Sequence, residues 1–426
     1  MRWLTLAGVG YLLALISFAA GIYVAHTRSW PFYEIRDVWR FVQGHRDETT
    51  SLLQKLTNDM DIRPARALKI YAPTDVDRFD QLDGMAFLDR REENPLLFVS
   101  DELPAGYVYI TGKFDFLDGM NGTILVSVPD GKLVRSWAVS DGIGKNKHHI
   151  GFHMRRDGSI VATASNGPLY HIDRCANEVG VLGGTFHHSI APIDEHRGWV
   201  SGSETEVDAI SIVDFDTLTV ERTIMLETIH EAADPEIAIF TFRIAGLDSW
   251  HLNDVEALPA SIAANSPFDA GDLVLSYRHN SLVYVLDPDT LEIKWWTQAF
   301  ASLQHDPDWQ PDGTISLYDN RSHKRGRFLT ITSYTPNGVQ APKILLNGER
   351  HGFYSDVGGQ HTIFDDESIL AVSHEQGRVL WVDRDDRVLF EFVNRYSDTE
   401  VLLLTNTGFL PADYFDEGTF ASCDQS

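Results

Sequence analysis

The sequence predicts an all-β protein, a six-bladed β-propeller preceded by an N-terminal transmembrane helix. Three observations carry this prediction. A long uncharged apolar run opens the chain, six hairpin-like segments recur after it, and most of these hairpins follow a histidine and a further strand. Repeats at intervals of roughly 40–60 residues are typical of propellers and solenoids. Four strands in each repeat favour a propeller.

The apolar run covers residues 3–25 and contains no charged side chain. About 20 apolar residues span a bilayer, whereas a cleavable signal peptide has a shorter apolar core and a clear cleavage site. We therefore expect an uncleaved signal anchor over residues 1–28, with a cleaved peptide as the alternative. A stalk helix or packing arm is expected over 29–66. The propeller domain, 67–426, is expected on the periplasmic, extracytoplasmic side of the cytoplasmic membrane, because Arg2 favours a cytoplasmic N-terminus.

Six segments share an apolar run, a turn rich in Asp, Pro or Gly, and a second apolar run. This pattern predicts β-hairpins. The segments are 124–137, 169–183, 210–224, 283–296, 329–346 and 379–392. Residues 225–250 are interpreted as an insertion between the third and fourth blades.

Most of these hairpins follow a histidine and a short strand. Such segments begin at His148, His187, His251, Gln304 and Gly359, and the first hairpin has no comparable histidine. In a propeller the innermost strands line the central channel, and their entrances lie on one face of the disc. The sequence therefore predicts a group of histidines at the mouth of the channel.

The chain contains 62 acidic and 35 basic residues, for a net charge of -27. A nucleic-acid-binding domain needs a basic surface, so this class of partner is excluded. The acidity is interpreted as a contribution to solubility. Cys175 and Cys423 are the only cysteines. A disulfide is permitted outside the cytoplasm, but the sequence leaves open whether these two pair.

Three kinds of site could use a group of histidines. Neutral imidazoles bind zinc or copper, but the chain has no HExxH motif and no Cys-His cluster, so no metal or cofactor is expected. The group could also line a ligand-binding channel without chemistry. In the third kind of site, one imidazole is a nucleophile, and the other imidazoles bind an anion together with an arginine. Arg278, in the same predicted blade as His251, suits that role because guanidinium reaches two oxygens at once. Alternatively, Arg278 is a surface turn residue with no part in a site.

Three segments resemble successive signatures of the bacterial arylsulfotransferase family. They read "DSWHLNDVEALP", "SYRHNSLVYVLDPDTLEIKWW" and "QHDPDWQPDGTISLYDN", at 248–259, 276–296 and 304–320. The resemblance implies a six-bladed propeller. It also implies PAPS-independent transfer of a sulfuryl group from a phenolic sulfate ester to a phenol, through a sulfated histidine.

Carried over by motif, the resemblance makes His305 the nucleophile. His251 and Arg278 would bind the sulfuryl oxygens or the leaving oxygen. One of His187 and His188 would complete the site, and the motif does not say which. Asp306, the next residue along the strand, is expected to point away from His305.

Two alternatives stay open. The chain could be a non-catalytic ligand-binding propeller, or a quinoprotein-like propeller oxidoreductase, because "LDPDTLEIKWW" resembles a repeat of that group. The catalytic imidazole must be neutral, so the rate should fall as His305 gains a proton. A nearby Arg278 would lower the pKa of His305 and a nearby carboxylate would raise it. A rate that is flat from about pH 8 to about pH 4 would argue against a histidine nucleophile.

Overall fold

The structure is a computed structural model. It describes residues 62–64, 80–81, 96–117, 121–139, 148–233, 250–298, 303–320, 329–336, 342–355, 357–397, 400–421 and 423. The chain divides into two compact units, Met1–Asp59 and Met60–Ser426. The anchor expected over residues 1–28 and most of the arm expected over 29–66 lie outside the described residues, so these boundaries stay predictions. Within the described ranges no helix is long and apolar enough to cross a membrane.

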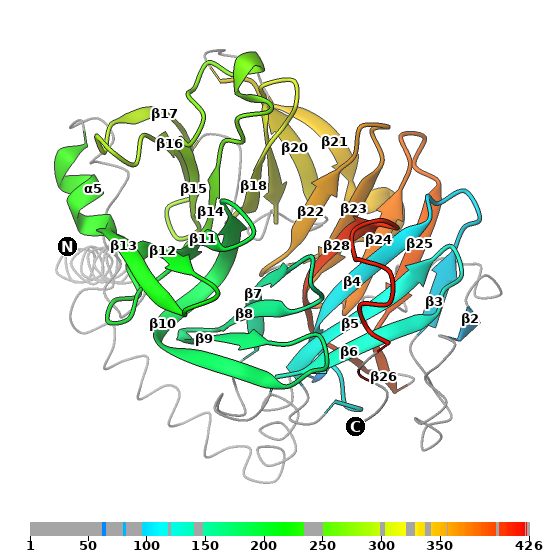
Figure 1. Cartoon of the computed structure of the whole chain (residues 1–426). Helices are drawn as coiled ribbons and strands as arrows, with labels where there is room; N and C mark the ends of the chain where they lie inside the picture. The colour runs from blue at the N-terminus through cyan, green and yellow to red at the C-terminus, as the bar shows by residue number, and fades with distance from the viewer. Residues whose placement is uncertain are drawn as a thin grey trace, which may run out of the picture. The chain divides into compact units, whose positions relative to one another are not determined.

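The unit Met60–Ser426 is built from β-sheets arranged in a propeller-like ring (Figure 1). One four-stranded sheet joins strands from the two ends of this unit, in the order β28-β4-β5-β6. These strands are β4 (Gly106–Lys113), β5 (Asn121–Val128), β6 (Leu133–Ala138) and β28 (Leu404–Pro411). Pairing of β28 with β4 explains why no histidine precedes the first hairpin. The innermost strand of that sheet comes from the far end of the sequence.

The next sheet has seven strands in sequence order, because β10 is long enough to pair with both β9 and β11. Its first strands are β7 (His149–Met154), β8 (Ile160–Ala164), β9 (Gly167–Ile172) and β10 (Glu178–Pro192). The others are β11 (Arg197–Ser201), β12 (Ala209–Asp214) and β13 (Thr219–Met225). The shared strand β10 fuses two of the expected blades into one sheet. For this reason the count of six separate blades is not confirmed.

Two four-stranded sheets follow. The first contains β14 (Leu252–Ala257), β15 (Leu273–Tyr277), β16 (Leu282–Leu286) and β17 (Ile293–Thr297). The second contains β18 (His305–Trp309), β19 (Ile315–Asp319), β20 (Thr330–Tyr334) and β21 (Lys343–Asn347). Every residue of β15 and β16 is buried, as expected for central strands covered on both faces.

The last large sheet has the order β2-β3-β25-β24-β23-β22. Its strands are β2 (Asp80–Gln81), β3 (Leu96–Val99), β22 (Gln360–Ile363), β23 (Ile369–Ser373), β24 (Arg378–Val382) and β25 (Val388–Val393). A small sheet contains β1 (Ile62–Pro64), β26 (Arg395–Ser397) and β27 (Glu400–Leu402).

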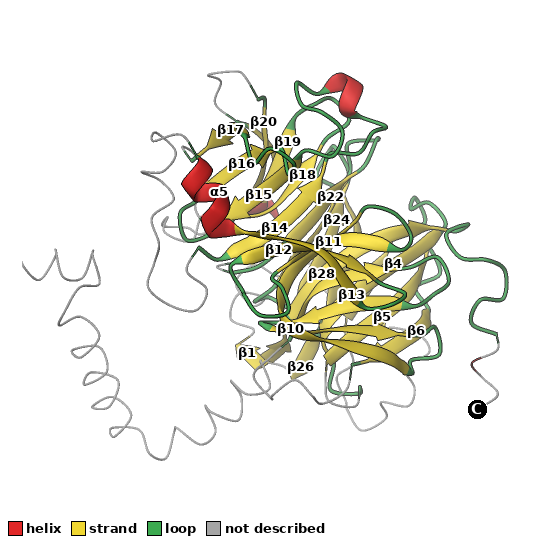
Figure 2. Ribbon diagram, turned by 60° about the vertical axis from the view of Figure 1, so that its left-hand side comes forward, coloured by secondary structure: helices red, strands yellow, loops and turns green. Residues whose placement is uncertain are grey.

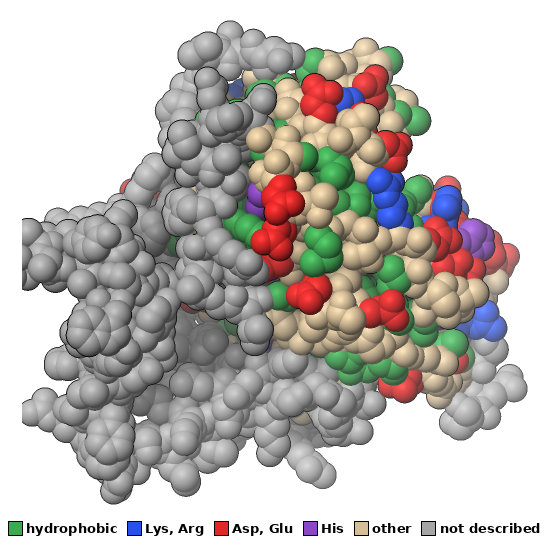
Figure 3. Space-filling view, turned by 90° about the vertical axis from the view of Figure 1, so that its left-hand side faces the viewer, with side chains coloured by type: hydrophobic (Ala, Val, Ile, Leu, Met, Phe, Trp, Pro, Cys, Tyr) green, Lys and Arg blue, Asp and Glu red, His purple; other side chains and the backbone are tan. Residues whose placement is uncertain are grey.

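The helical elements in the described part of the chain are short, and α5 lies at the edge of the sheets (Figure 2). They are α5 (Leu226–Ala232), η3 (Ala263–Asn265) and η4 (Gly348–His351). Helix α5 occupies the start of the expected insertion, whose residues 234–249 are outside the described part of the chain. Acidic side chains are spread over the face shown in Figure 3, which agrees with a role in solubility.

All six predicted hairpins are antiparallel strand pairs. They are β5–β6, β9–β10, β12–β13, β16–β17, β20–β21 and β24–β25. The innermost strands β7, β10, β14, β18, β22 and β28 contact one another in a closed ring. Side chains that point inward from this ring line the central channel.

Cys175 and Cys423 form a disulfide that spans 248 residues of sequence. Cys175 lies in the β9–β10 turn, and the C-terminal segment before Cys423 packs Phe420 against Trp137. The bridge therefore ties this terminal segment to the ring.

We expect Cys175→Ser to lower the free energy of unfolding by about 2–5 kcal/mol, because a bridge that closes a long loop removes entropy from the unfolded chain. Guanidinium unfolding of the variant and of the wild type, with and without reductant, measures this. Equal stabilities would contradict it.

Candidate active site

The innermost strands are irregular at their entrances. Each of the strands that carries a predicted site residue has a β-bulge there, and a bulge re-aims the neighbouring side chains. The bulges lie between His187 and Ile190 in β10, between Leu252 and Asp254 in β14, and between His305 and Asp308 in β18.

Three non-glycine residues at these entrances have left-handed backbone conformations. The φ angles are 49° at His188, 55° at His251 and 52° at Asp306. Such a conformation costs about 1–2 kcal/mol for a residue with a Cβ atom. Strain of this kind gathers at functional sites, where the surrounding structure enforces it.

A cavity of about 310 Å³ lies at these entrances. Four of the five predicted site residues line it: His188, His251, Arg278 and His305. His187 does not. The other lining residues are His148, Ile150, Ser165, Asn253, Asp306, Val357, Gly358, Gly359, Gln360, His374 and Thr405. The cavity therefore brings together residues that are more than 100 positions apart in the sequence.

His305 is held by hydrogen bonds at both ring nitrogens. Nδ1 lies 2.8 Å from Oδ1 of Asn320, and the Asn320 amide nitrogen donates to the carbonyls of Ser355 and Gly358. This fixes Oδ1 as an acceptor, so Nδ1 of His305 carries the proton and Nε2 keeps its lone pair. The Gly358 N–H faces Nε2 at 3.3 Å. Burial, with help from the positive charge of Arg278, lowers the pKa of His305 to about 3.

Two glycines allow the chain to pass this close to His305. Gly358 has φ 66° and Gly359 has φ 129°, both in the region that favours glycine. A Cβ atom at Gly359 would lie 2.3 Å from the ring of Tyr318. The sequence "GG" at this point is therefore needed for the backbone N–H to reach the imidazole.

His187 and His188 have different positions and different roles. His187 is fully buried outside the cavity, with Nε2 2.9 Å from the Val207 carbonyl and Nδ1 2.9 Å from Nδ1 of His188. A carbonyl only accepts, so in the uncharged pair Nε2 of His187 donates to it. Nδ1 of His187 must then accept from Nδ1 of His188, which leaves Nε2 of His188 as an acceptor. Burial, followed by the neighbouring histidines, holds the pKa of His188 well below its usual range.

Arg278 and His251 approach the cavity together. Arg278 directly follows β15, and its backbone N–H donates to the carbonyl of His251 at 3.0 Å. The His251 ring lies 4.8 Å from the His188 ring and 4.8 Å from the His279 ring, between centroids. Arg278 lines the cavity and does not sit in an outer surface turn.

Two further residues at this cavity were not predicted from the sequence motifs. Gln304 is fully buried, and its amide donates to the hydroxyl of Ser276 and to the carbonyl of Leu282. It thereby ties β18 to the neighbouring sheet. Asn253 lines the cavity, and its amide nitrogen donates to the Gln304 carbonyl at 2.7 Å. Its Oδ1 is buried and has no hydrogen-bond partner in the described part of the chain.

Asp306 lines the same cavity as His305, next to the bulge in β18. Its carboxylate contacts a neighbouring strand and does not orient His305. It accepts from Nδ1 and from the backbone N–H of His361, at 2.7 and 2.5 Å. The nearby turn is capped by Asp312, which accepts from the Thr314 N–H at 3.0 Å.

Residues 221–395 match the model of the arylsulfotransferase (ASST) family. This segment contains three of the predicted site residues, His251, Arg278 and His305. His187 and His188 precede it.

No curated protein matches the chain. Among solved structures, the chain is similar to a protein of unknown function from Bacteroides caccae, with 9% identity and a TM-score of 0.47. That alignment covers 72% of this chain and 99% of the other. A chain of a mitotic checkpoint complex is similar with 13% identity and a TM-score of 0.37, over 64% of this chain and 68% of the other.

Proposed function

We propose that the protein is a PAPS-independent arylsulfotransferase in which His305 carries the sulfuryl group between two phenols. The observation that carries the proposal is the state of His305. Its Nε2 is an uncharged nucleophile at neutral pH, in a cavity that also holds Arg278, His251 and His188. We also interpret the ring as six four-stranded units, two of which share β10.

In the first half-reaction Nε2 of His305 attacks the sulfur of an aryl sulfate. The new S–N bond forms as the bond from sulfur to the aryl oxygen breaks, and a phenoxide leaves. The Arg278 guanidinium holds sulfuryl oxygens through its planar fork. Positive charge on the sulfated ring is stabilised by the Nδ1–H bond to Oδ1 of Asn320. The Gly358 N–H donates to Nε2 in the free site, so it must release this lone pair before the attack, and it can then donate to a sulfuryl oxygen beside Nε2.

In the second half-reaction a phenol attacks the same sulfur and frees His305. The incoming hydroxyl must lose its proton as the S–O bond forms. Nε2 of His188 is the acceptor for that proton, because Nδ1 of His188 is already bonded to His187. His187 is thus a positioning residue, since it fixes which nitrogen of His188 faces the cavity.

A direct test supplies the purified protein with a chromogenic aryl sulfate. We expect release of the coloured phenol to depend on a second phenol, with ping-pong kinetics. Release without an acceptor, at the same rate, would indicate a hydrolase. No release with any of a panel of aryl sulfates would leave a binding propeller as the better account.

The pH dependence follows from the lowered pKa of His305. Protonation of His305 blocks its attack on sulfur. Burial together with the charge of Arg278 lowers the pKa of His305 to about 3, so the ring gains a proton only near that pH. His305 therefore stays neutral from pH 8 down to about pH 4, and we expect no loss of rate from this group over that range. A flat pH–rate profile is thus the expected one. This corrects the sequence-based expectation that a flat profile argues against a histidine nucleophile, because that expectation assumed an imidazole of ordinary pKa. Loss of activity with a midpoint near pH 6.5 would contradict the environment described for His305.

We further propose that residues 3–25 anchor the protein in the cytoplasmic membrane, with the ring of sheets on the periplasmic side. The run is uncharged and long enough to span the hydrocarbon core. The full chain should then sediment with membranes and resist extraction by high salt, which removes only electrostatically bound proteins. Recovery of a soluble protein that begins after residue 25 would contradict the anchor.

A further inference from the structure

The aryl oxygen of a sulfate ester gains negative charge as its bond to sulfur breaks. The donors assigned so far act elsewhere. Arg278 and the Gly358 N–H hold sulfuryl oxygens, and Asn320 holds the ring of His305. A donor beside the aryl oxygen would stabilise the charge that develops there. The arrangement of the innermost strands indicates where that oxygen lies.

The Nε2 atom of His305 faces the central channel. Strand β18 is the innermost strand of its sheet, and β19 lies next to it on the outer side. Asn320 directly follows β19, and Nδ1 of His305 is bonded to Asn320. The two nitrogens of an imidazole point in nearly opposite directions, so Nε2 points inward. A sulfur atom bound to Nε2 therefore lies inside the ring of strands.

Strand β7 lies across the channel from β18. The innermost strands contact one another in the order β7, β10, β14, β18, β22 and β28, and β28 contacts β7. Strands β7 and β18 are therefore three places apart in both directions. In an in-line displacement the attacking and leaving atoms lie on opposite sides of the transferred group. The aryl oxygen opposite Nε2 of His305 is thus on the β7 side. His251, at the entrance of the adjacent strand β14, lies beside the sulfur instead.

His148 is the histidine at the entrance of β7. It directly precedes this strand, as His251 directly precedes β14, and it lines the same cavity as His305. An imidazole carries at least one N–H whether it is neutral or charged. His148 is also near His188, because its charge is among those that lower the pKa of His188 after burial and the charge of His251. One oxygen can therefore lie between His148 and His188.

His374 packs against the ring of His148. It directly follows β23, the place that Arg278 has after β15 and Asn320 has after β19. The rings of His374 and His148 are 5.3 Å apart between centroids and meet edge to face, at 60°. His374 is buried, and a Cβ atom at Gly358 would lie 3.0 Å from its ring. Close packing of this kind leaves the His374 ring little room to turn.

We propose that an N–H of His148 donates a hydrogen bond to the aryl oxygen, and that His374 is a positioning residue that holds the His148 ring. This proposal rests on the proposed sulfuryl transfer. As the S–N bond to His305 forms and the S–O bond breaks, the electron pair of the S–O bond stays on the aryl oxygen, where the His148 N–H stabilises it. In the second half-reaction the acceptor hydroxyl takes the same place. It accepts from His148 and gives its proton to Nε2 of His188.

The first test compares two aryl sulfates whose phenols differ in acidity. His148→Phe keeps a ring against His374 and loses the N–H. We expect it to lower kcat/KM for phenyl sulfate by ~10²-fold. The loss with 4-nitrophenyl sulfate should be less than ~10-fold, because nitrophenoxide spreads its own charge and needs the donor less. His148→Gln, which again offers an N–H, should recover part of the rate with phenyl sulfate.

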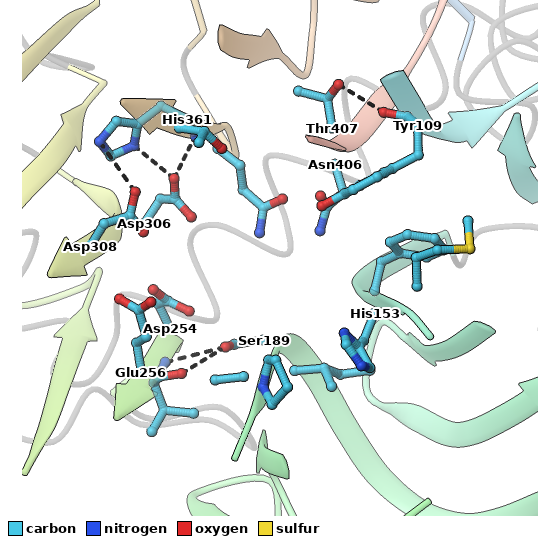
Figure 4. Close-up of a pocket in the computed structure, with 18 of the residues that line it drawn as sticks. Tyr109, His153, Ser189, Asp254, Glu256, Asp306, Asp308, His361, Asn406 and Thr407 are labelled. Atoms are coloured by element: carbon cyan, nitrogen blue, oxygen red, sulfur yellow. Dashed lines mark hydrogen bonds and ion pairs between the residues drawn. The ribbon is translucent and has the colours of Figure 1, made fainter. Parts of the chain in front are cut away.

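His153→Phe is the matched control. His153 belongs to the same strand, β7, but lines a second cavity, of about 430 Å³, further along the innermost strands (Figure 4). It is not among the residues that line the cavity of His305. This variant should therefore keep the wild-type ratio of the rates with the two sulfates.

Variants of His374 test its role as a positioning residue. His374→Phe keeps a ring against His148 and should keep the wild-type ratio of the two rates. His374→Ala removes the edge-to-face contact. It should change the ratio in the same direction as His148→Phe, because a mobile His148 ring holds the aryl oxygen less well.

Binding of phenol tests the hydrogen bond without turnover, so it separates this proposal from the proposed function. Phenol and toluene, which differ by a hydroxyl in place of a methyl group, are titrated into the protein by calorimetry. We expect the wild type to prefer phenol, and His148→Phe to weaken phenol binding about 10-fold without weakening toluene binding. If phenol binds in this way and no aryl sulfate turns over, the proposed function fails and the hydrogen bond from His148 stands. Three results would overturn the proposal. They are equal losses with the two sulfates in His148→Phe, unchanged phenol binding in that variant, and a wild type that does not prefer phenol to toluene.

Discussion

His305→Ala is expected to lower the rate of aryl sulfate turnover by at least about 10³-fold, because it removes the nucleophile. The variant should retain the fold, since the ring of His305 bonds to Asn320, to the Gly358 N–H and to the Leu303 backbone and belongs to no apolar core cluster of the described residues. Steady-state transfer between an aryl sulfate and a phenol measures the effect, with circular dichroism as the check on folding.

His196→Ala is the matched control for His305→Ala. The His196 side chain is 65% exposed and lines neither cavity, so the control should keep the wild-type rate. If His305→Ala transfers at the wild-type rate while His251→Ala is inactive, the nucleophile is misassigned. If both variants are active, the likeness to arylsulfotransferases does not extend to the chemistry of this chain.

Arg278→Ala is expected to lower kcat/KM by ~10²–10³-fold, because a donor to the sulfuryl oxygens is lost from a buried site. Most of the loss should appear in kcat, since negative charge on the oxygens is redistributed in the transition state. Arg278→Lys should recover only part of the rate, because an ammonium keeps the charge but not the planar fork.

Arg156→Ala is the control for Arg278→Ala. Its side chain is 63% exposed and it lines neither cavity. A change confined to KM in Arg278→Ala would assign Arg278 to uniform binding of the substrate and would contradict its role in the transition state.

Much of the fold could be predicted because it follows from local signals. Each hairpin combines alternating apolar residues with turn chemistry over a short window, and all six appear as strand pairs. The closure of the ring by β28 could not be predicted from a short window of sequence, because β28 pairs with β4 from the other end of the unit. The same holds for the continuous β10 and for the Cys175–Cys423 disulfide.

The convergence of His251 and His305 could be predicted because each precedes or begins an innermost strand of the repeat. Arg278 was predicted beside them because it lies in the same blade as His251. The choice between His187 and His188 could not be predicted, because it depends on a bulge in β10 and on a hydrogen bond to the Val207 carbonyl. The hydrogen bond between Asp306 and His361 was also missed. The two residues come from different strands, and no short motif contains both.

The most direct test of the central claim is an intact mass spectrum of the protein, taken at neutral pH after brief incubation with an aryl sulfate and no phenol. We expect a mass gain of one sulfuryl group, mapped by peptide fragmentation to His305 and discharged on addition of a phenol. The gain should be absent in His305→Ala and present in His196→Ala. Turnover of the aryl sulfate without any covalent adduct, or an adduct on another residue, would contradict His305 as the carrier.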